Sequence, residues 1–250
     1  MSVNANYQLA LRTSNGSAWT WGLGTSGQLG DNTVLSKSSP VSVVGAHQFN
    51  AITGGGSHSL SLKGDGSVWG WGVGTSGQLG QGTVATSRFS PVSIVGAFSF
   101  NAIIAGASHS LAVKSSDGSV WAWGLGTTGQ LGQAPEVPVN KSSPVLVVGA
   151  HSFNAIAAGG VHSLGLKGND GSVWAWGTGT NGQMGDNTAT SKSSPVSVVG
   201  AHSFSAITGG GPLFGYSIAL KGNDGSVWGW GNGSSGQFGQ GTIALDRSSP

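Results

Sequence analysis

Six histidines are the residues of this sequence best suited to acid–base or metal chemistry, because the chain contains no cysteine. They recur at two positions of a repeated pattern. A metal site needs three or four ligands that converge on one point, and one histidine per repeat does not supply them. We therefore predict that the chain binds no metal ion and no cofactor, and that the histidines at both recurring positions have a structural role. The first set is His58, His109 and His162, with Tyr7 and Tyr216 as counterparts, and the second is His47, His151 and His202, with Phe98 as counterpart.

Other catalytic arrangements are not indicated either. No Ser-His-Asp set can be singled out, because serine and histidine recur from repeat to repeat. The glycine-rich segment GLGTSGQLG at 22–30 has a superficial GxGxxG spacing, but no helical pattern follows it, so a phosphate-binding loop is not predicted. We predict that the chain is not an enzyme.

Basic residues could indicate a nucleic-acid partner, and all ten of them fall at two further recurring positions. Nucleic-acid binding needs a basic surface that acids do not compensate. Here eight acids accompany the ten bases, and the net charge is only +2. We predict that the basic residues are solvated and that the nearby acids balance their charge. We therefore expect no nucleic-acid partner. The first basic position holds Arg12, Lys63, Lys114, Lys167 and Lys221, with Asp65, Asp117, Asp170 and Asp224 nearby; the second holds Lys37, Arg88, Lys141, Lys192 and Arg247, with Asp31, Glu136, Asp186 and Asp246 nearby.

The repeat that positions these residues is about fifty residues long and occurs five times. Each copy carries Trp-x-Trp-Gly, then Gly-Gln-(Leu/Met/Phe)-Gly, then Ser-Pro. The first tryptophans are Trp19, Trp69, Trp121, Trp174 and Trp228, so all ten tryptophans belong to the repeat. We expect one domain over 1–250, in which each repeat forms one structural unit. The units span about 1–45, 46–96, 97–149, 150–200 and 201–250.

Each repeat has the local periodicity of four β-strands. In the second repeat, 57–63 and 66–72 alternate large and small residues, which is typical of strands. The Asp65–Gly66 step between them is a strong hairpin signal. Two further strands are expected at segments like 49–55 and 40–45. A four-stranded unit with this period predicts an all-β fold, a β-propeller of five blades.

The run AITGGGSHSLSLKGDGSVWGWGVGTSGQLGQGT at 51–83 resembles the repeat of the RCC1 (regulator of chromosome condensation) family, and so do its counterparts. The resemblance implies a propeller fold. Members include a guanine-nucleotide exchange factor that binds chromatin, bacterial inhibitors of β-lactamases, and viral and phage-encoded proteins, which this sequence resembles most in style. The fold hosts unrelated activities, so the resemblance is a weak guide to function.

Two departures from the family pattern matter. The family usually has seven repeats, whereas this sequence has five. Compared with the other copies, the first has a clipped innermost strand and the last lacks the outer segment PVSVVG. We expect one of two explanations. Either the sequence is a fragment, or the last blade exposes a strand edge that pairs with another chain, by self-association or with a neighbouring protein.

Positions that break the repeat are the candidate contact residues, since rule-breaking positions tend to be functional. They lie in the second, third and fifth repeats, and exposed apolar side chains there would form a contact surface. Drift among duplicated repeats is the alternative explanation. The candidates are Phe89, Pro135, Glu136, Pro138, Pro212, Leu213 and Phe214.

Low charge, 7% of residues, and nearly identical repeats favour a non-enzymatic structural or adhesive protein. We expect it on a virion, as a phage tail or capsid appendage, or on another extracellular surface. The alternative is a soluble RCC1-like module that regulates a partner protein. No signal peptide or membrane-spanning run is recognised, so no membrane insertion is expected.

Overall fold

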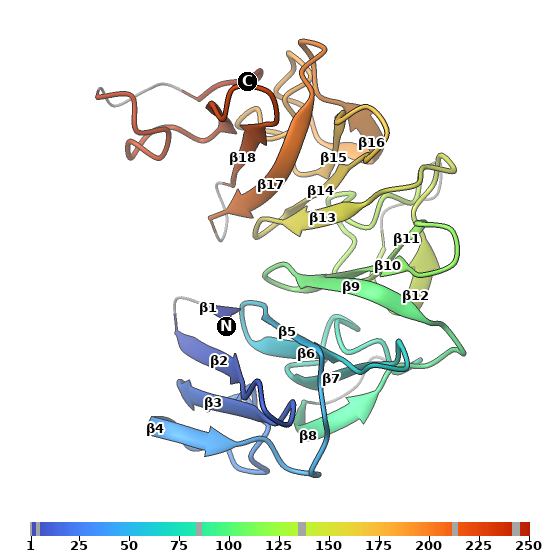
Figure 1. Ribbon diagram of the computed structural model, residues 1–250, viewed down its shortest axis with the longest axis vertical. Helices are drawn as coiled ribbons and strands as arrows, with labels where there is room; N and C mark the ends of the chain where they lie inside the picture. The colour runs from blue at the N-terminus through green and yellow to red at the C-terminus, as the bar shows by residue number, and fades with distance from the viewer. Residues whose placement is uncertain (1, 4–5, 84–86, 135–138, 212–214, 242–245) are drawn as a thin grey trace. The chain divides into compact units, whose positions relative to one another are not determined.

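The computed structural model describes residues 2–3, 6–83, 87–134, 139–211, 215–241 and 246–250, and all of its regular elements are β-strands. They form five antiparallel sheets that follow one another along the chain (Figure 1). The first sheet contains β1 (Ser2–Val3), β2 (Tyr7–Leu11), β3 (Ala18–Gly22) and β4 (Lys37–Ser42); the second contains β5 (Ala51–Gly54), β6 (His58–Leu62), β7 (Val68–Gly72) and β8 (Arg88–Ser93).

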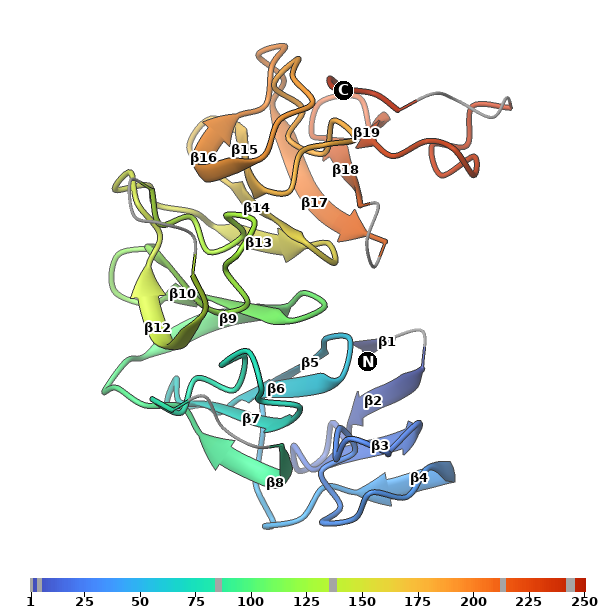
Figure 2. The ribbon, with the colours of Figure 1, turned by 180° about the vertical axis from the view of Figure 1, so that it is seen from behind.

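The remaining sheets repeat this order, and the fifth sheet, including β19, is seen from behind in Figure 2. The third sheet contains β9 (Phe100–Ala105), β10 (His109–Lys114), β11 (Val120–Gly124) and β12 (Lys141–Leu146). The fourth contains β13 (Ala155–Ala158), β14 (His162–Leu166), β15 (Val173–Gly177) and β16 (Lys192–Ser197). The fifth contains β17 (Phe204–Gly210), β18 (Tyr216–Lys221) and β19 (Val227–Gly231).

Contacts between Cα atoms divide the chain into two compact units. The first unit consists of Met1–Asp117, Trp121–Leu125 and Asn140–Val145, and it holds the first two sheets and most of the third. The second consists of Gly118–Val120, Gly126–Val139 and Leu146–Pro250, and it holds the fourth and fifth sheets. Every contact described below lies within one unit.

The hairpin between the second and third strands of each sheet has the predicted turn chemistry. In the second sheet, Gly66 adopts a positive φ of 83°, which a glycine accepts without strain. The Asp65 carboxylate accepts hydrogen bonds from the Ser67 amide at 2.9 Å and hydroxyl at 2.6 Å. The Ser67 hydroxyl in turn accepts a bond from the Trp69 indole at 3.3 Å. These carboxylates therefore serve the turns.

The fourth strand begins three residues earlier than the sequence predicts. We expected it to open at Pro40, but β4 starts at Lys37, which pairs with Gly22 at the end of β3. Arg88 and Lys192 open their strands in the same way. The proline is tolerated inside the strand because the fourth strand is the sheet's edge, where one side of the backbone has no strand to bond.

The two irregular sheets match the expectations for the first and fifth repeats. The innermost strand of the first sheet, β1, is only two residues long. The fifth sheet has three strands. Beside β19, Arg247 forms an isolated bridge with Gly231, which is the pair that opens the fourth strand elsewhere.

Apolar residues pack between successive sheets. One cluster in the first unit joins Leu60, Leu62 and Val68 of the second sheet to Phe100 and Trp123 of the third, and all five are at most 5% exposed. A matching cluster in the second unit joins the fourth and fifth sheets. The core therefore consists of repeated interfaces between blades.

Candidate protein-binding surface

A repeated hydrogen-bonded junction, which we call the latch, links each sheet to the next within its unit. The backbone carbonyl of Gln28 accepts bonds from the Trp71 indole at 2.9 Å and the Ser59 hydroxyl at 2.8 Å. The Gln28 side chain meanwhile caps its own turn by accepting the Ser26 amide at 2.8 Å. The same pair of donors reaches the carbonyls of Gln78, Gln130 and Gln183, from Trp123 and Ser110, Trp176 and Ser163, and Trp230 and Ser217.

The first histidine set belongs to this latch. The Nε2 atom of His58 lies 3.1 Å from the Ser110 hydroxyl, and that of His162 lies 3.0 Å from the Ser217 hydroxyl. Each serine already donates its proton to a glutamine carbonyl, so it accepts from the histidine. Nε2 therefore carries a proton and is no general base. In the first repeat, the Tyr7 hydroxyl lies 3.2 Å from the Ser59 hydroxyl and donates its own proton to the His58 carbonyl at 2.5 Å.

Burial sets the protonation state of these histidines. Both His58 and His162 are fully buried, and burial lowers the pKa of each imidazole from 6.5 to about 4. A buried charge without a counter-charge is costly, so both rings are neutral near pH 7. Their position inside the latch gives them the structural role that we predicted.

The second histidine set stacks on tryptophan. The ring of His47 lies 4.4 Å from that of Trp69 and 5.5 Å from that of Phe49. Its pKa is lowered by partial burial and by the nearby Lys63 ammonium, which itself sits 4.1 Å from the centre of the Trp69 ring. His151 and His202 repeat the ring contacts.

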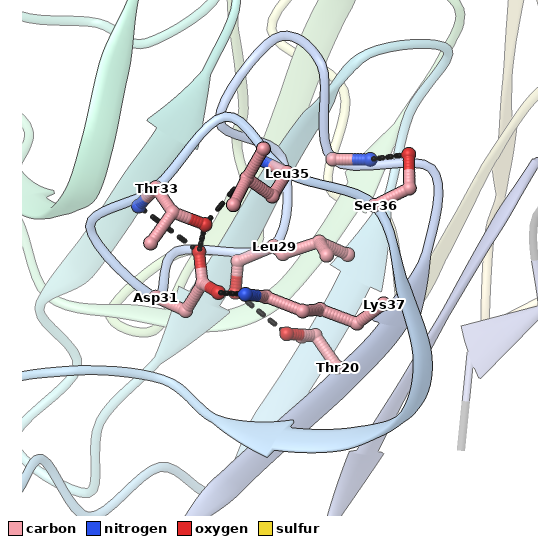
Figure 3. A network of polar contacts seen from close by, with 8 residues as sticks. Thr20, Leu29, Asp31, Thr33, Leu35, Ser36 and Lys37 are labelled. Carbon is pink, nitrogen blue, oxygen red and sulfur yellow. Dashed lines mark hydrogen bonds and ion pairs between the residues drawn. The ribbon is translucent and has the colours of Figure 1, made fainter.

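Most basic residues with described partners are neutralised inside their own repeat. In the polar network of Figure 3, the Lys37 ammonium lies 3.3 Å from the Asp31 carboxylate, which also accepts the Thr33 hydroxyl at 2.8 Å and amide at 3.1 Å. Burial raises the pKa of Asp31, but these bonds outweigh it and hold the pKa below 3.8. Ion pairs with the same role join Lys192 to Asp186, Lys114 to Asp117 and Lys221 to Asp224.

Two repeats use a different pair at this position. In the second repeat, Gln81 accepts a bond from the Arg88 guanidinium at 2.9 Å, and in the fifth, Gln240 accepts one from Arg247 at 2.6 Å. Aspartate therefore accompanies lysine in the first and fourth repeats, and glutamine accompanies arginine in the second and fifth, whereas the third repeat has Gln133 and Lys141 at these positions. Both pairs hold the basic group at the start of the fourth strand, but only the aspartate compensates its charge.

Among the described residues, no three His, Cys, Asp or Glu groups lie close enough together to hold a metal ion. The described part of the chain also has no helix long and apolar enough to cross a membrane.

Of the predicted contact residues, only Phe89 lies in the described part of the chain. Pro135, Glu136, Pro138, Pro212, Leu213 and Phe214 lie outside the described residues. Phe89 is 41% exposed, and its ring lies against Gly27 of the first repeat, where an added Cβ would come within 2.4 Å. The counterparts of Phe89 are all serine: Ser38, Ser142, Ser193 and Ser248.

Two more exposed apolar residues lie in the loop beside Phe89. The carbonyl of Phe89 accepts a bond from the Asn32 amide at 2.8 Å, which ties the start of β8 to the loop between β3 and β4. In that loop Val34 is 45% exposed and Leu35 is 63% exposed. We call Val34, Leu35 and Phe89 the Phe89 patch. Sequence reasoning found Phe89 but missed its two neighbours, because residues 34 and 35 break no repeat rule.

A second apolar surface lies on the fifth sheet. Val227 is 69% exposed, although its counterparts Val68, Val120 and Val173 are at most 2% exposed. Leu220 is also exposed, and Ile218 and Phe238 are half-buried. We call these four residues the fifth-blade face. Val227, Ile218 and Phe238 line a hollow of about 490 Å³ together with Trp228 and Gln237, among others.

A comparison with models of known protein families identifies the family to which this chain belongs. The family model for the "Regulator of chromosome condensation (RCC1) repeat" matches residues 15–62, 65–113, 117–166 and 170–211. The chain belongs to the RCC1 repeat family. The human E3 ubiquitin-protein ligase HERC2 is 34% identical over 205 residues, which cover 80% of this chain and 4% of HERC2. The ultraviolet-B receptor UVR8 of Arabidopsis thaliana is 28% identical over 249 residues, or 97% of this chain and 55% of UVR8.

Solved RCC1-type structures confirm the predicted fold class. Human WBSCR16 superposes with a TM-score of 0.82 at 24% identity, over 98% of this chain and 64% of WBSCR16. Yeast RCC1 (Prp20), in its complex with Kap60, superposes with the same score at 23% identity, over 98% of this chain and 58% of Prp20. The fold is an all-β propeller of RCC1-like blades, whose fifth sheet lacks the outer strand. The chain spans only part of each of these relatives.

Proposed function

We propose that this RCC1-type chain is a non-enzymatic protein-binding module and that the Phe89 patch is part of its contact surface. The observation that carries the proposal is the exposure of Phe89 beside Val34 and Leu35. Exposed aromatic and aliphatic side chains that gather at one place favour a protein partner. The neutralised basic positions argue for the same class of partner rather than nucleic acid.

Relatives with known protein partners support this class of function. Yeast RCC1 (Prp20) is known in a complex with Kap60, and Prp20p has binding properties towards Gsp1p and histones. We extend only the general property, protein binding through a propeller surface, to this chain. We therefore prefer the function of a module that regulates a partner protein to that of a virion component.

The predicted virion or extracellular location gains no support from the relatives described above, which are ligases, receptors and RCC1 proteins. It stays a prediction, as does pairing through the edge of the last blade. The single domain over 1–250 is likewise proposed.

The test is to replace Phe89 by the residue that the other repeats use. Phe89→Ser copies Ser38 and Ser142, so the fold should tolerate it. A partner captured from cells that encode the protein should bind the Phe89→Ser variant at least tenfold more weakly, since buried aromatic anchors at interfaces are worth about 2 kcal/mol or more. The matched control is Leu146→Ser, which restores the serine found at Ser42 and Ser93 and lies outside the patch. An unchanged affinity for Phe89→Ser would refute the proposal.

A further inference from the structure

The Phe89 patch has a positively charged neighbour whose charge no acid compensates. Arg88 is the residue before Phe89 at the start of β8, and its side chain is exposed. Its Nε atom donates a hydrogen bond to the neutral side-chain oxygen of Gln81 at 2.9 Å. Among the residues that the structure describes, no acceptor binds the terminal Nη atoms of Arg88. The Gln81 bond therefore orients the guanidinium and leaves the end with its two Nη atoms available to a carboxylate.

The segments that carry the patch hold one unbalanced positive charge. Residues 22–42 and 72–93 include the loops before β4 and β8 and these two strands, and their charged side chains are Asp31, Lys37 and Arg88. Asp31 and Lys37 lie 3.3 Å apart and balance each other. Arg88 therefore supplies the net charge of this surface.

The exposure of Leu35 is a property of its position in the loop. Leu35 lies two residues before the lysine that opens β4, and Val139 and Thr190 hold the same place before β12 and β16. Both of these counterparts are exposed as well. The Arg-Phe pair at 88–89 is specific to the second repeat, since the other repeats have Lys-Ser or Arg-Ser there. The second repeat therefore adds an aromatic ring and an arginine to a loop surface that several repeats expose.

We propose that the Phe89 patch and Arg88 together bind a protein segment in which an aspartate or glutamate lies beside large apolar side chains. This inference rests on the proposed protein-binding function and names the chemistry of the partner. The apolar side chains pack on Phe89 and Leu35, and the carboxylate accepts two hydrogen bonds from the Nη atoms of Arg88. Complementary charge favours such a segment over a neutral or basic one.

The geometry of β8 also sets how the segment lies. Successive side chains of a strand point to opposite faces, so Arg88 and Phe89 flank the start of β8 on its two sides. Phe89 lies against Gly27 of the first repeat, whereas Arg88 bonds to Gln81 of its own repeat. The bound segment therefore crosses the start of β8, with its apolar anchor on one side and its acid on the other.

The first experiment selects binders from a displayed library of random peptides, with the wild-type chain as bait and Phe89→Ser as counter-bait. We expect the peptides that prefer the wild type to be enriched in aspartate or glutamate beside leucine, isoleucine, phenylalanine or tryptophan. Peptides that depend on Phe89 but carry no acid would overturn this inference and leave the proposed function standing. A selection that yields no peptide dependent on Phe89 would count against both.

The second experiment assigns the acid of a selected peptide to Arg88. The peptide should bind Arg88→Gln about tenfold more weakly than the wild type, since the carboxylate loses its partner. After the acid is replaced by its amide, the peptide should bind both proteins equally, because the pair is already broken. Arg88→Lys copies the lysine of Lys37 and Lys141 and should give an intermediate affinity, because an ammonium keeps the charge but not the planar fork.

The matched control is Arg12→Gln, which removes the charge of another exposed arginine, outside the patch. It should bind the selected peptide like the wild type. An acidic peptide that binds Arg88→Gln as tightly as the wild type, or that loses as much affinity with Arg12→Gln, would overturn the pairing with Arg88.

Discussion

Acid should destabilise this protein through the buried histidines of the latch. Burial lowers the pKa of His58 and His162 from 6.5 to about 4. The unfolded chain therefore binds protons at these rings below about pH 6.5, whereas the folded chain does so only near pH 4. The free energy of unfolding should be highest above pH 6.5, fall as the pH drops towards 4, and level off below it with respect to these two groups.

The size of the effect follows from the same two pKa values. A tenfold difference in proton affinity is worth about 1.4 kcal/mol, so each histidine contributes about 3 kcal/mol over the whole window. Between pH 6.5 and pH 5 the two together should cost about 3 kcal/mol, a large part of the stability of an ordinary domain. Asp31 and Asp186 act in a lower window, because their pKa values are held below 3.8 and their contribution is lost only as the pH falls through those values.

The assay is urea unfolding followed by tryptophan fluorescence at a series of pH values. The diagnostic variant is His162→Tyr, because Tyr7 performs the same task in the first repeat and bonds to Ser59. Gly54 leaves room beside the Tyr7 hydroxyl, and Gly159 and Gly215 leave room beside the His162 ring. The variant should lose about half of the pH-dependent destabilisation, or about 1.6 kcal/mol between pH 6.5 and pH 5. A wild type whose stability is flat over that range would refute the reasoning, and so would a His162→Tyr variant with the full wild-type loss.

Two further substitutions test other parts of the fold by the same urea assay. Trp71→Phe leaves the Gln28 carbonyl short of one buried donor and should cost about 1–3 kcal/mol. Trp21→Phe should cost well under 1 kcal/mol beyond the change in ring size, because the Trp21 indole has no acceptor among the residues that the structure describes. Equal costs for the two variants would contradict the latch. Asp186→Asn removes the charge that lies 3.0 Å from the Lys192 ammonium and should lower the free energy of unfolding by about 1 kcal/mol at neutral pH. This effect should vanish in acid, where Asp186 is protonated. A loss of stability that persists at low pH would mean that the shape of the side chain matters rather than its charge.

The fold was predictable because its signals are local and repeated. The Asp65–Gly66 step has the hairpin geometry that its sequence indicates, and the alternation around Leu60 and Trp71 matches the buried faces of β6 and β7. The start of the fourth strand was placed wrongly at Pro40. A proline usually marks a boundary, but at a sheet edge it costs no ladder bond, and only the pairing of Lys37 with Gly22 reveals the true start.

The site was less predictable, because its chemistry depends on backbone atoms and on neighbours distant in sequence. The recurrence of Gln28 and its counterparts was visible, but not that its carbonyl is the acceptor for the next sheet. Phe89 was found because it replaces serine, whereas Leu35 joins it only through the fold. The exposure of Val227 had no signal in the sequence, since the same valine is buried in other repeats.

The latch also has a consequence for how such a gene can change. Each repeat carries the glutamine carbonyl and the histidine or tyrosine that contact its successor, and the tryptophan and serine that bind its predecessor. Duplicating one repeat therefore copies both sides of a working joint. Unequal recombination between the nearly identical coding segments would add or remove a blade without requiring a compensating mutation at any new boundary. Blade number can therefore drift in this lineage faster than the residues at the joints, and related genes should differ in repeat count while keeping Gln, Trp and Ser at these positions.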